Sequence, residues 1–289
     1  MAFTNSQNYI TVIGAAGQTG LRIVKWLLKK GASTGVIIHN ESQRKKIPIG
    51  ADTNIADISC LNELVAALQN TNTVYYIPPV FITDEVTFGE NVIAAAKSAG
   101  VFRLVYHSVM HSATREMPHH WRKHQVELLL KDSGLQWTIV QPAMYSQTPL
   151  SFLSANKNAM RIGFSAEKSF TPIDLEDLGE AVAIILTGES YENKTLELAG
   201  NDLLNFREMA EIIGHVLGHK VKISRFQSFI VSAIAAMHLR PNAAKTIKAM
   251  MDHYDKNGFV SNSHTLEEIL GRKPNTFLQT MERELLHQN

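Results

Sequence analysis

Several common features are scarce in this chain of 289 residues. Its only cysteine, Cys60, excludes an internal disulfide and is typical of a reducing compartment. The longest apolar run, residues 229–237, is interrupted by Ser232 and is too short to cross a bilayer. The first residues lack the cationic segment and the apolar core of a signal peptide. We therefore expect a soluble, cytoplasmic protein that does not bind membranes.

An excess of charge of either sign is also missing. The 28 lysines and arginines nearly balance the 27 aspartates and glutamates, which leaves a formal net charge of +1. No basic stripe, repeat or low-complexity tract stands out along the chain. A nucleic-acid partner is not expected, because binding to a phosphate backbone requires concentrated positive charge. The sequence leaves a homodimer open.

The most informative segment is a glycine-rich turn near the N-terminus. An apolar, β-branched run at residues 9–13 is followed by three glycines at intervals of three residues, and a helical pattern begins at once. A strand, a tight turn and a helix in this order place backbone N–H groups and a helix N-terminus against a pyrophosphate. A tight β–α turn without a ligand is the plainer alternative. We expect a dinucleotide to bind at Gly14, Gly17, Gln18, Thr19 and Gly20.

Strand-like and helix-like segments alternate through the first two-thirds of the chain. Apolar strands separated by amphipathic helices predict a parallel sheet covered on both faces, and right-handed crossovers make it a doubly wound α/β sheet of the Rossmann type. The expected strands are residues 9–13, 35–39, 54–56, 73–77, 103–107 and 137–140. The expected helices are residues 18–30, 61–69, 84–99, 119–131 and 174–186.

After Pro142 this alternation breaks. Residues 195–199 are expected to add one more strand, and Asp174 and Asp177 are placed to cap the helix before it. From residue 201 onward helices dominate, at 206–217, 229–238, 242–254 and 276–286. We expect a dinucleotide-binding domain at residues 1–150, completed by residues 164–200, and a smaller, mostly helical domain built from residues 151–163 and 201–289.

The tip of the second strand bears on the choice of dinucleotide. It lies about twenty residues after Gly20, where a dinucleotide fold meets the adenosine ribose. His39 stands at the tip, and Glu41 and the basic pair Arg44 and Lys45 follow it. A basic cluster here favours a 2′-phosphate, so NADP(H) is the expected cofactor. A solvated basic loop, with Glu41 on the ribose, would instead fit NAD(H).

Two later strand ends supply further candidates. Asp57 follows the third strand, where its carboxylate would accept a hydrogen bond from the adenine amino group. As an acid before a helix, Asp57 would also interact favourably with the helix dipole. Ile77 and Pro78 end the fourth strand, and the proline stops strand pairing, so we expect backbone there to line a ribose or nicotinamide site.

Longer motifs in this chain resemble those of one family. Residues 133–142 have the sequence SGLQWTIVQP. This is similar to the run SGLxxTIxRP of the NmrA-like branch of the atypical short-chain dehydrogenase/reductase superfamily, with Gln141 in place of the usual arginine. The resemblance covers most of the first two hundred or so residues and carries no information about the substrate. Further matching segments are residues 14–20, 56–57, 61–68, 91–108, 123–140 and 170–183.

The resemblance also implies catalytic positions. Ordinary members of the superfamily use a serine, an acid/base tyrosine, and a lysine that lowers the pKa of the tyrosine and holds the nicotinamide ribose. Ser108 occupies the serine position and Lys123 the lysine position, but His119 stands where the tyrosine is expected. The catalytic candidates are thus Ser108, His119 and Lys123. Lys123 and Tyr145 are also implied to lie beside the bound dinucleotide.

A group of histidines raises the alternative of a metal site. His120 and His124 are four residues apart on an expected helix, a spacing that zinc ligands adopt. No glutamate completes the motif, and Glu116 lies outside the helix. We therefore expect no metal, and we expect solvent or the cofactor to face the five histidines of this stretch, which are His107, His111, His119, His120 and His124.

Two hypotheses for the function follow. The first is an NADPH-dependent reductase of a small apolar electrophile, such as a quinone or another conjugated carbonyl, with the cofactor positioned for hydride transfer. The second, motivated by His119 at the tyrosine position, is a non-catalytic NADP(H)-sensing regulator that acts through a protein partner. We favour the reductase because Ser108 and Lys123 are retained. A nucleotide-sugar epimerase would ordinarily need the missing tyrosine.

Overall fold

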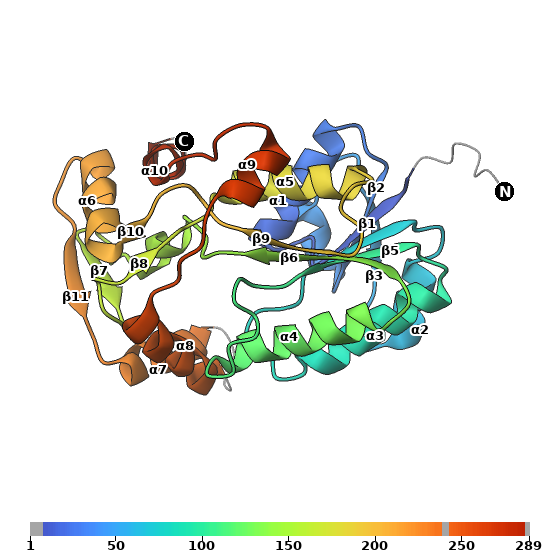
Figure 1. The fold of residues 1–289 in the computed structure, drawn as a ribbon, viewed down its shortest axis with the longest axis horizontal. Coiled ribbons are helices and arrows are strands. Elements are labelled where there is room, and N and C mark those ends of the chain that lie inside the picture. Colours follow the sequence, from blue (N-terminus) through green and yellow to red (C-terminus); the bar gives the residue numbers. More distant parts are fainter. Residues whose placement is uncertain (1–7, 239–242, 287–289) are drawn as a thin grey trace.

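The computed structural model describes residues 8–238 and 243–286 (Figure 1). Its centre is a sheet of seven strands, all of them parallel. In spatial order the strands are β3 (Asp52–Ile55), β2 (Thr34–Ile38), β1 (Ile10–Ile13), β4 (Thr73–Tyr76), β5 (Arg103–His107), β6 (Gln136–Pro142) and β9 (Lys194–Leu198). The chain moves outward from β1 in one direction and then returns to β4 to continue in the other, which makes the gap between β1 and β4 the switch point of the sheet.

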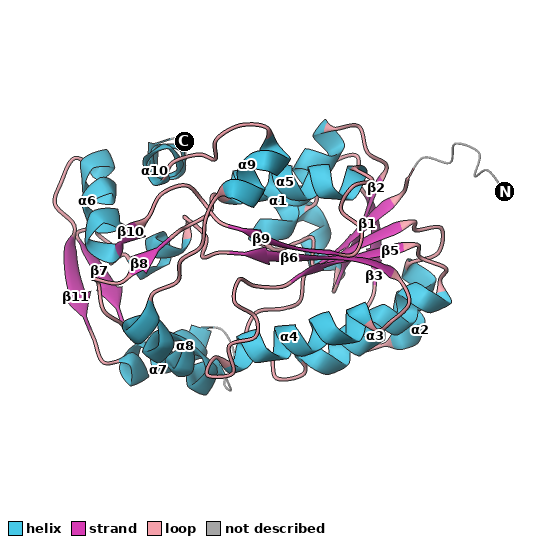
Figure 2. Cartoon of the chain, in the orientation of Figure 1, coloured by secondary structure: helices cyan, strands magenta, loops and turns pink. Residues whose placement is uncertain are grey.

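Helices cover both faces of this sheet (Figures 1 and 2). On one face α1 (Gln18–Lys29) packs against α5 (Leu175–Thr187), and on the other α3 (Glu85–Ser98) packs between α2 (Leu61–Ala67) and α4 (Pro118–Lys131). Strands β1, β2, β4 and β5 are buried along their whole length, which explains why their sequences are mostly apolar and do not alternate with charged residues. The predicted doubly wound α/β fold is confirmed, and the expected elements of this part differ from the observed ones only at their ends.

The remaining elements gather at the end of the sheet where the strands point (Figure 2). Two small sheets lie there: β7 (Ala159–Ile162) pairs in parallel with β11 (Lys222–Arg225), and β8 (Ser169–Phe170) pairs antiparallel with β10 (Leu204–Asn205). The sequence analysis missed these strands because two to four residues are too few to establish a period. The helices are α6 (Phe206–Leu217), α7 (Ser228–His238), α8 (Ala243–Asn257), α9 (His264–Leu270) and α10 (Phe277–Leu286), with 3-10 turns η1 (Glu41–Lys46) and η2 (Thr148–Phe152) elsewhere in the chain.

The C-terminal helices return to the central sheet. Helix α9, which the sequence analysis did not anticipate, packs on α5 and β9, while α10 packs on α6. The helix expected from residue 242 is α8, and residue 242 itself lies outside the described residues. The proposed division into two domains stays a prediction. Within the described ranges, no helix combines the length and the apolar character needed to cross a membrane.

Candidate active site

A cavity of about 760 Å³ opens beyond the ends of the first four strands of the chain, at the switch point of the sheet. Ligands of doubly wound folds bind in this place because the loops that follow adjacent strands diverge there. Ten residues that the sequence analysis assigned to a dinucleotide line this cavity: Gly14, Gly17, Gln18, Thr19, Gly20, His39, Asp57, Ile77, Pro78 and Tyr145. Their assignment to a particular cofactor atom remains a prediction.

Two of the glycines shape the turn between β1 and α1. Gly14 has a φ of +85°, and a Cβ on it would lie 2.5 Å from the carbonyl oxygen of Ile77. A Cβ on Gly20 would lie 2.5 Å from the carbonyl oxygen of Gly14. Neither position accepts a side chain, because the backbone of the turn presses against β4 on one side and against α1 on the other. The start of α1 thus approaches the backbone of the turn closely at Gly20.

Gly17 differs from the other two glycines because the protein itself leaves room there. A Cβ on Gly17 would meet only the carbonyl oxygen of Gly14, at an ordinary 3.6 Å. Gly17 is the N-cap of α1, yet no side chain caps this helix and its first turn contains no acidic residue. The first N–H groups of a helix need acceptors, and the positive end of its dipole attracts anions. The open space at Gly17 therefore fits the pyrophosphate of a dinucleotide.

Four polar residues line the end of the cavity near β2 and β3. Gln43 Oε1 accepts a hydrogen bond of 3.0 Å from the backbone N–H of His39. Asp57 Oδ1 accepts hydrogen bonds of 2.8 Å from both the backbone N–H and the hydroxyl of Ser59, and these bonds lower the pKa of Asp57. Asp57 is thus a carboxylate at neutral pH, as recognition of an amino group requires. The sequence analysis missed Gln43 and Ser59, which carry no motif of their own.

Arg44 and Lys45, the expected ligands of a 2′-phosphate, do not line the cavity. Both lie on η1, where Arg44 Nε is 2.5 Å from Glu41 Oε1 and Arg44 Nη1 is 3.4 Å from the carbonyl oxygen of Thr53. The ion pair is exposed and holds the guanidinium against the protein's own chain. A contact between these two side chains and a 2′-phosphate stays a prediction.

Part of the cavity wall is apolar. Ile77, Pro78, Pro79 and Val80, which follow β4, and Phe88 of α3 contribute to it. The next residue of this loop, Phe81, has a φ of +55°, a conformation that is strained for a bulky side chain. Its ring is held by an edge contact with His119, with the ring centroids 5.1 Å apart.

Tyr145 also lines the cavity, and its hydroxyl belongs to a chain of hydrogen bonds. Tyr75 Oη is 2.6 Å from His107 Nδ1, and His107 Nε2 is 2.9 Å from Tyr145 Oη. Thr19 Oγ1 also donates to Tyr145 Oη, over a long 3.4 Å. The sequence analysis gave no role to Tyr75 and grouped His107 with the histidines expected to face solvent or the cofactor. The signal that was available is register: Tyr75 pairs with Val105, so His107, two residues further along β5, lies on the same face of the sheet.

Ser108 points away from the cavity, toward α4. Its hydroxyl donates to the carboxylate of Glu127, which also accepts hydrogen bonds from Ser112 (3.0 Å) and Gln141 (2.7 Å). Ser108 and Glu127 are 2% and 1% exposed. The hydroxyl of Ser108 is therefore occupied by a bond that holds the start of the loop between β5 and α4. Ser108 does not line the cavity.

Lys123 is also engaged elsewhere. Its Nζ lies 2.6 Å from Glu85 Oε1, and the same oxygen accepts a 3.1 Å hydrogen bond from Tyr106 Oη. Glu85 is buried at the start of α3, so the ammonium group neutralises a carboxylate that would otherwise be isolated in the interior. Lys123 does not line the cavity in this arrangement.

The sequence analysis expected the five histidines within residues 107–124 to face solvent or the cofactor, and this is wrong for three of them. His107, His119 and His120 are 5%, 8% and 0% exposed. Burial, and then the nearby charges of His120, Lys123 and Arg122, hold the pKa of His119 well below its usual value. His119 is therefore neutral near pH 7, and its place between Phe81 and His120 makes it a packing residue. No group of three or more His, Cys, Asp or Glu side chains in the described part of the chain is arranged to hold a metal ion.

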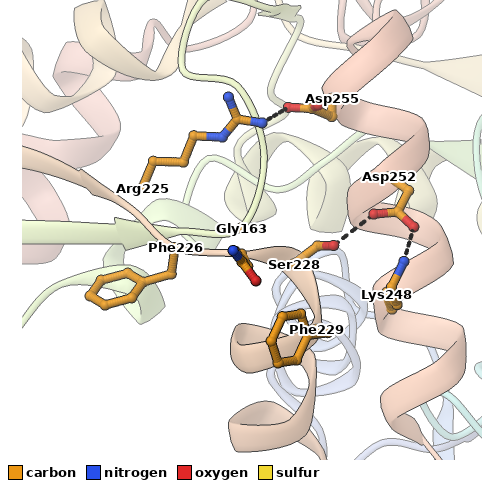
Figure 3. A pocket seen from close by; sticks show the side chains of 9 residues that line it. Gly163, Arg225, Phe226, Ser228, Phe229, Lys248, Asp252 and Asp255 are labelled. Carbon is orange, nitrogen blue, oxygen red and sulfur yellow. Dashed lines mark hydrogen bonds and ion pairs between the residues drawn. The ribbon is translucent and has the colours of Figure 1, made fainter.

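A second cavity, of about 480 Å³, lies between β11, α7 and α8 (Figure 3). Its charged side chains pair with one another: Arg225 Nη2 is 2.7 Å from Asp255 Oδ1, and Asp252 accepts from both Lys248 and Ser228. Because these charges are already balanced and exposed, this cavity offers no group that awaits a ligand. The cavity at the switch point is the better candidate for the active site.

The chain is similar to known proteins over nearly its whole length. The model of the NmrA-like family matches residues 6–282. Quinone oxidoreductase 2 of Escherichia coli (strain K12) is 24% identical over 277 residues, which cover 94% of this chain and 97% of the relative.

Two solved structures are similar in fold. The NADPH-dependent quinone oxidoreductase QOR2 of Escherichia coli complexed with NADPH has a TM-score of 0.83 at 23% identity, with 95% of this chain and 99% of that chain covered. The triphenylmethane reductase of Citrobacter sp. complexed with NADP(H) has a TM-score of 0.82 at 22% identity, with 96% and 100% covered.

Proposed function

The chain belongs to the NmrA-like family, and from that premise we propose that it is a reductase that uses NADPH to reduce a small apolar electrophile, such as a quinone or another conjugated carbonyl. One observation carries the proposal. The uncapped N-terminus of α1 lines a cavity of about 760 Å³ whose wall also contains a group of apolar side chains, so one cavity combines groups that suit phosphates with groups that suit a flat hydrophobic ring.

The cavity residues divide into groups that suit the parts of NADPH. The backbone N–H groups at Gly17, Gln18 and Thr19 would hold the pyrophosphate, and Asp57 would accept from the adenine amino group. His39 and Gln43 lie where the adenosine ribose of a doubly wound fold is found. When bound, the dihydronicotinamide supplies a hydride, and the protein contributes its position against the acceptor.

The apolar wall supports a conjugated acceptor. Pro79, Val80 and Phe88 offer carbon surface and no charge, so they would exclude water from the reacting atoms and favour an aromatic or quinoid ring. Relatives that are named for the reduction of quinones and triphenylmethane dyes support the same class of substrate.

The alternative of a non-catalytic regulator has less support. Its motivating feature was His119 in place of a tyrosine, and the contact between His119 and Phe81 provides a packing role for that residue.

The test is to measure NADPH binding and NADPH consumption separately. We expect NADPH to quench or shift the protein's tryptophan fluorescence in a saturable titration, and a panel of quinones to be reduced with one NADPH consumed per quinone. Saturable binding without turnover of any quinone, azo dye or triarylmethane dye would favour the regulator and contradict the reductase.

A further inference from the structure

Three side chains, Tyr75 of β4, His107 of β5 and Tyr145 from the loop after β6, form a hydrogen-bonded chain that ends at the cavity. We propose that Tyr145 is the proton donor to the reduced substrate, and that Tyr75 and His107 hold its hydroxyl in the donating orientation. This inference rests on the reductase function proposed above. It assigns the acid role to a residue outside the serine, histidine and lysine positions that the family resemblance implied.

The direction of the hydrogen bonds follows from burial. Burial, with a smaller effect of Lys123, lowers the pKa of His107 to about 3, so its ring is neutral and carries a single N–H. Tyr75 is 0% exposed, and His107 Nδ1 is the one partner of its hydroxyl among the described residues. A buried hydroxyl hydrogen without an acceptor is costly, so Tyr75 donates to Nδ1. The histidine N–H is then on Nε2 and donates to Tyr145 Oη.

This arrangement leaves the hydrogen of Tyr145 available. Tyr145 Oη accepts from His107 Nε2 at 2.9 Å and from Thr19 Oγ1 at 3.4 Å. With both neighbours donating, no group within the described part of the chain accepts the phenolic hydrogen. The ring of Tyr145 is only partly buried and lines the cavity, so this hydrogen can be donated to a bound molecule.

The other candidates cannot take this role in the observed arrangement. The hydroxyl of Ser108 donates to Glu127, the ammonium group of Lys123 is paired with Glu85, and His119 is neutral and packed under Phe81. The remaining titratable groups of the cavity, His39 and Asp57, follow β2 and β3, on the other side of β1 from the hydrogen-bonded chain that starts on β4 and β5. Among these candidates, Tyr145 lines the cavity with a hydrogen that no described residue accepts.

The chemistry balances for a quinone. The quinone gains a hydride, which brings two electrons, and one of its oxygens becomes an oxyanion. The O–H bond of Tyr145 breaks and an O–H bond forms on that oxygen, which gives the neutral hydroquinone. The phenolate left on Tyr145 is stabilised by the N–H of His107 and the hydroxyl of Thr19, and it regains a proton from water at the mouth of the cavity.

The decisive experiment compares two acceptors that differ in their need for a proton. A quinone needs one proton for each hydride, whereas a cationic triarylmethane dye becomes neutral by accepting the hydride alone. We expect Tyr145→Phe to lower kcat for the quinone by about 100-fold, at the lower end of what a general acid contributes, and to change kcat for the dye by less than about threefold. Equal losses with both acceptors, or no loss with the quinone, would overturn the proposal.

Tyr76→Phe is the matched control. It makes the same chemical change one residue from Tyr75, at a hydroxyl that is buried without a partner among the described residues. Tyr76 points to the opposite face of the sheet, where it packs with the residues under α3 and α4. Both activities should be unchanged in this variant.

A measurement without substrate tests the hydrogen bonds separately. Difference absorbance of phenolate in the free protein, compared with Tyr145→Phe, isolates the titration of Tyr145, whose pKa is raised by burial. His107→Phe should raise the pKa of Tyr145 further, because it removes a donor to the phenolate. An unchanged pKa would overturn the positioning role of His107. If the unmodified protein binds NADPH but reduces neither acceptor, the proposed reductase function fails instead. The titration still shows whether His107 donates a hydrogen bond to Tyr145.

Discussion

Helices α1 and α5 pack side by side on the same face of the sheet, yet their N-termini differ. The N-terminus of α1 has no side-chain cap, no acidic residue in its first turn and a cavity in front of it. The N-terminus of α5 is capped by Asp174, whose carboxylate accepts from the backbone N–H of Glu176 at 3.1 Å, and carries Glu176 and Asp177 in its first turn. The predicted cap at Asp174 is confirmed.

The carboxylates at α5 are themselves enclosed. Arg283 donates two hydrogen bonds to Asp174, of 2.8 and 2.6 Å, and Arg272 Nη2 is 2.8 Å from Asp177. Asp174 and Asp177 are 1% and 0% exposed. The positive end of α5 is therefore satisfied within the chain, while that of α1 is left to a ligand. The uncapped N-terminus and the cavity in front of it together distinguish α1 from α5.

The largest expected effect comes from making α1 resemble α5. Gly17→Asp places a carboxylate at the N-cap of α1, where the backbone is extended and a Cβ has space. We expect NADPH affinity to fall by about 100-fold or more, because the carboxylate occupies and repels the phosphate position, while stability rises by a few tenths of a kcal/mol. Fluorescence titration and thermal melting measure the two effects. Gly17→Ala adds a methyl group without a charge and should lose much less affinity for NADPH. If both variants lost the same NADPH affinity, space rather than charge would decide binding at Gly17.

The second prediction weakens the closed end of α5. Asp174→Asn keeps a good N-cap but removes the charge that pairs with Arg283, and we expect unfolding to become easier by about 2 kcal/mol with NADPH affinity unchanged. Denaturant unfolding and NADPH titration provide the comparison. A loss of NADPH affinity at intact stability would contradict the separation of the two helix ends.

The same variant yields a pH dependence. Burial alone would raise the pKa of Asp174, but hydrogen bonds and the charge of Arg283 outweigh it, so the pKa lies below its usual value. A lowered pKa contributes stability that is present above the pKa of the unfolded chain and is lost as the pH falls through that of the folded state. The difference in stability between the unmodified protein and Asp174→Asn should therefore shrink on acidification below about pH 4.

The smallest predicted effect comes from Gln43, which lines the cavity beyond the end of β2. Gln43→Glu preserves the oxygen that accepts from the N–H of His39 but adds a negative charge to the cavity wall. We expect NADPH affinity to fall about tenfold more than NADH affinity, since only NADPH carries a 2′-phosphate. Arg44→Ala is the companion variant, and a preferential loss of NADPH there would support the original assignment of Arg44. Equal losses of both cofactors in Gln43→Glu would place Gln43 away from the 2′ position.

Local patterns sufficed for the turn and the sheet because each depends on neighbours in the sequence. The β-branched run before Gly14 and the helix-spaced leucines after Gly20 belong to one strand–turn–helix unit, whose geometry is decided within about twenty residues. Helix α9 and the short strands of the C-terminal region were missed, since pairing with distant partners rather than an internal period defines them.

The catalytic positions could not be predicted in the same way. Ser108 and Lys123 are the residue types that the resemblance calls for. The direction in which each side chain points, however, is set by a buried carboxylate: Glu127 of α4 accepts from Ser108, and Glu85 of α3 pairs with Lys123. Arg44 is likewise held by Glu41 and Thr53. Spacing along the chain places a side chain on an element, whereas its hydrogen-bond partners decide where it points.

The sequence by itself determined that this chain forms a doubly wound sheet and presents an open glycine turn at the start of its first helix. The tertiary structure decided which polar groups remain free to act at that turn. It brought Tyr75 and His107 from two strands and Tyr145 from the loop after β6 into one hydrogen-bonded chain, and it paired Ser108 and Lys123 with carboxylates. The physical reason is that a buried polar group must find a partner, and the partners lie far away in the sequence.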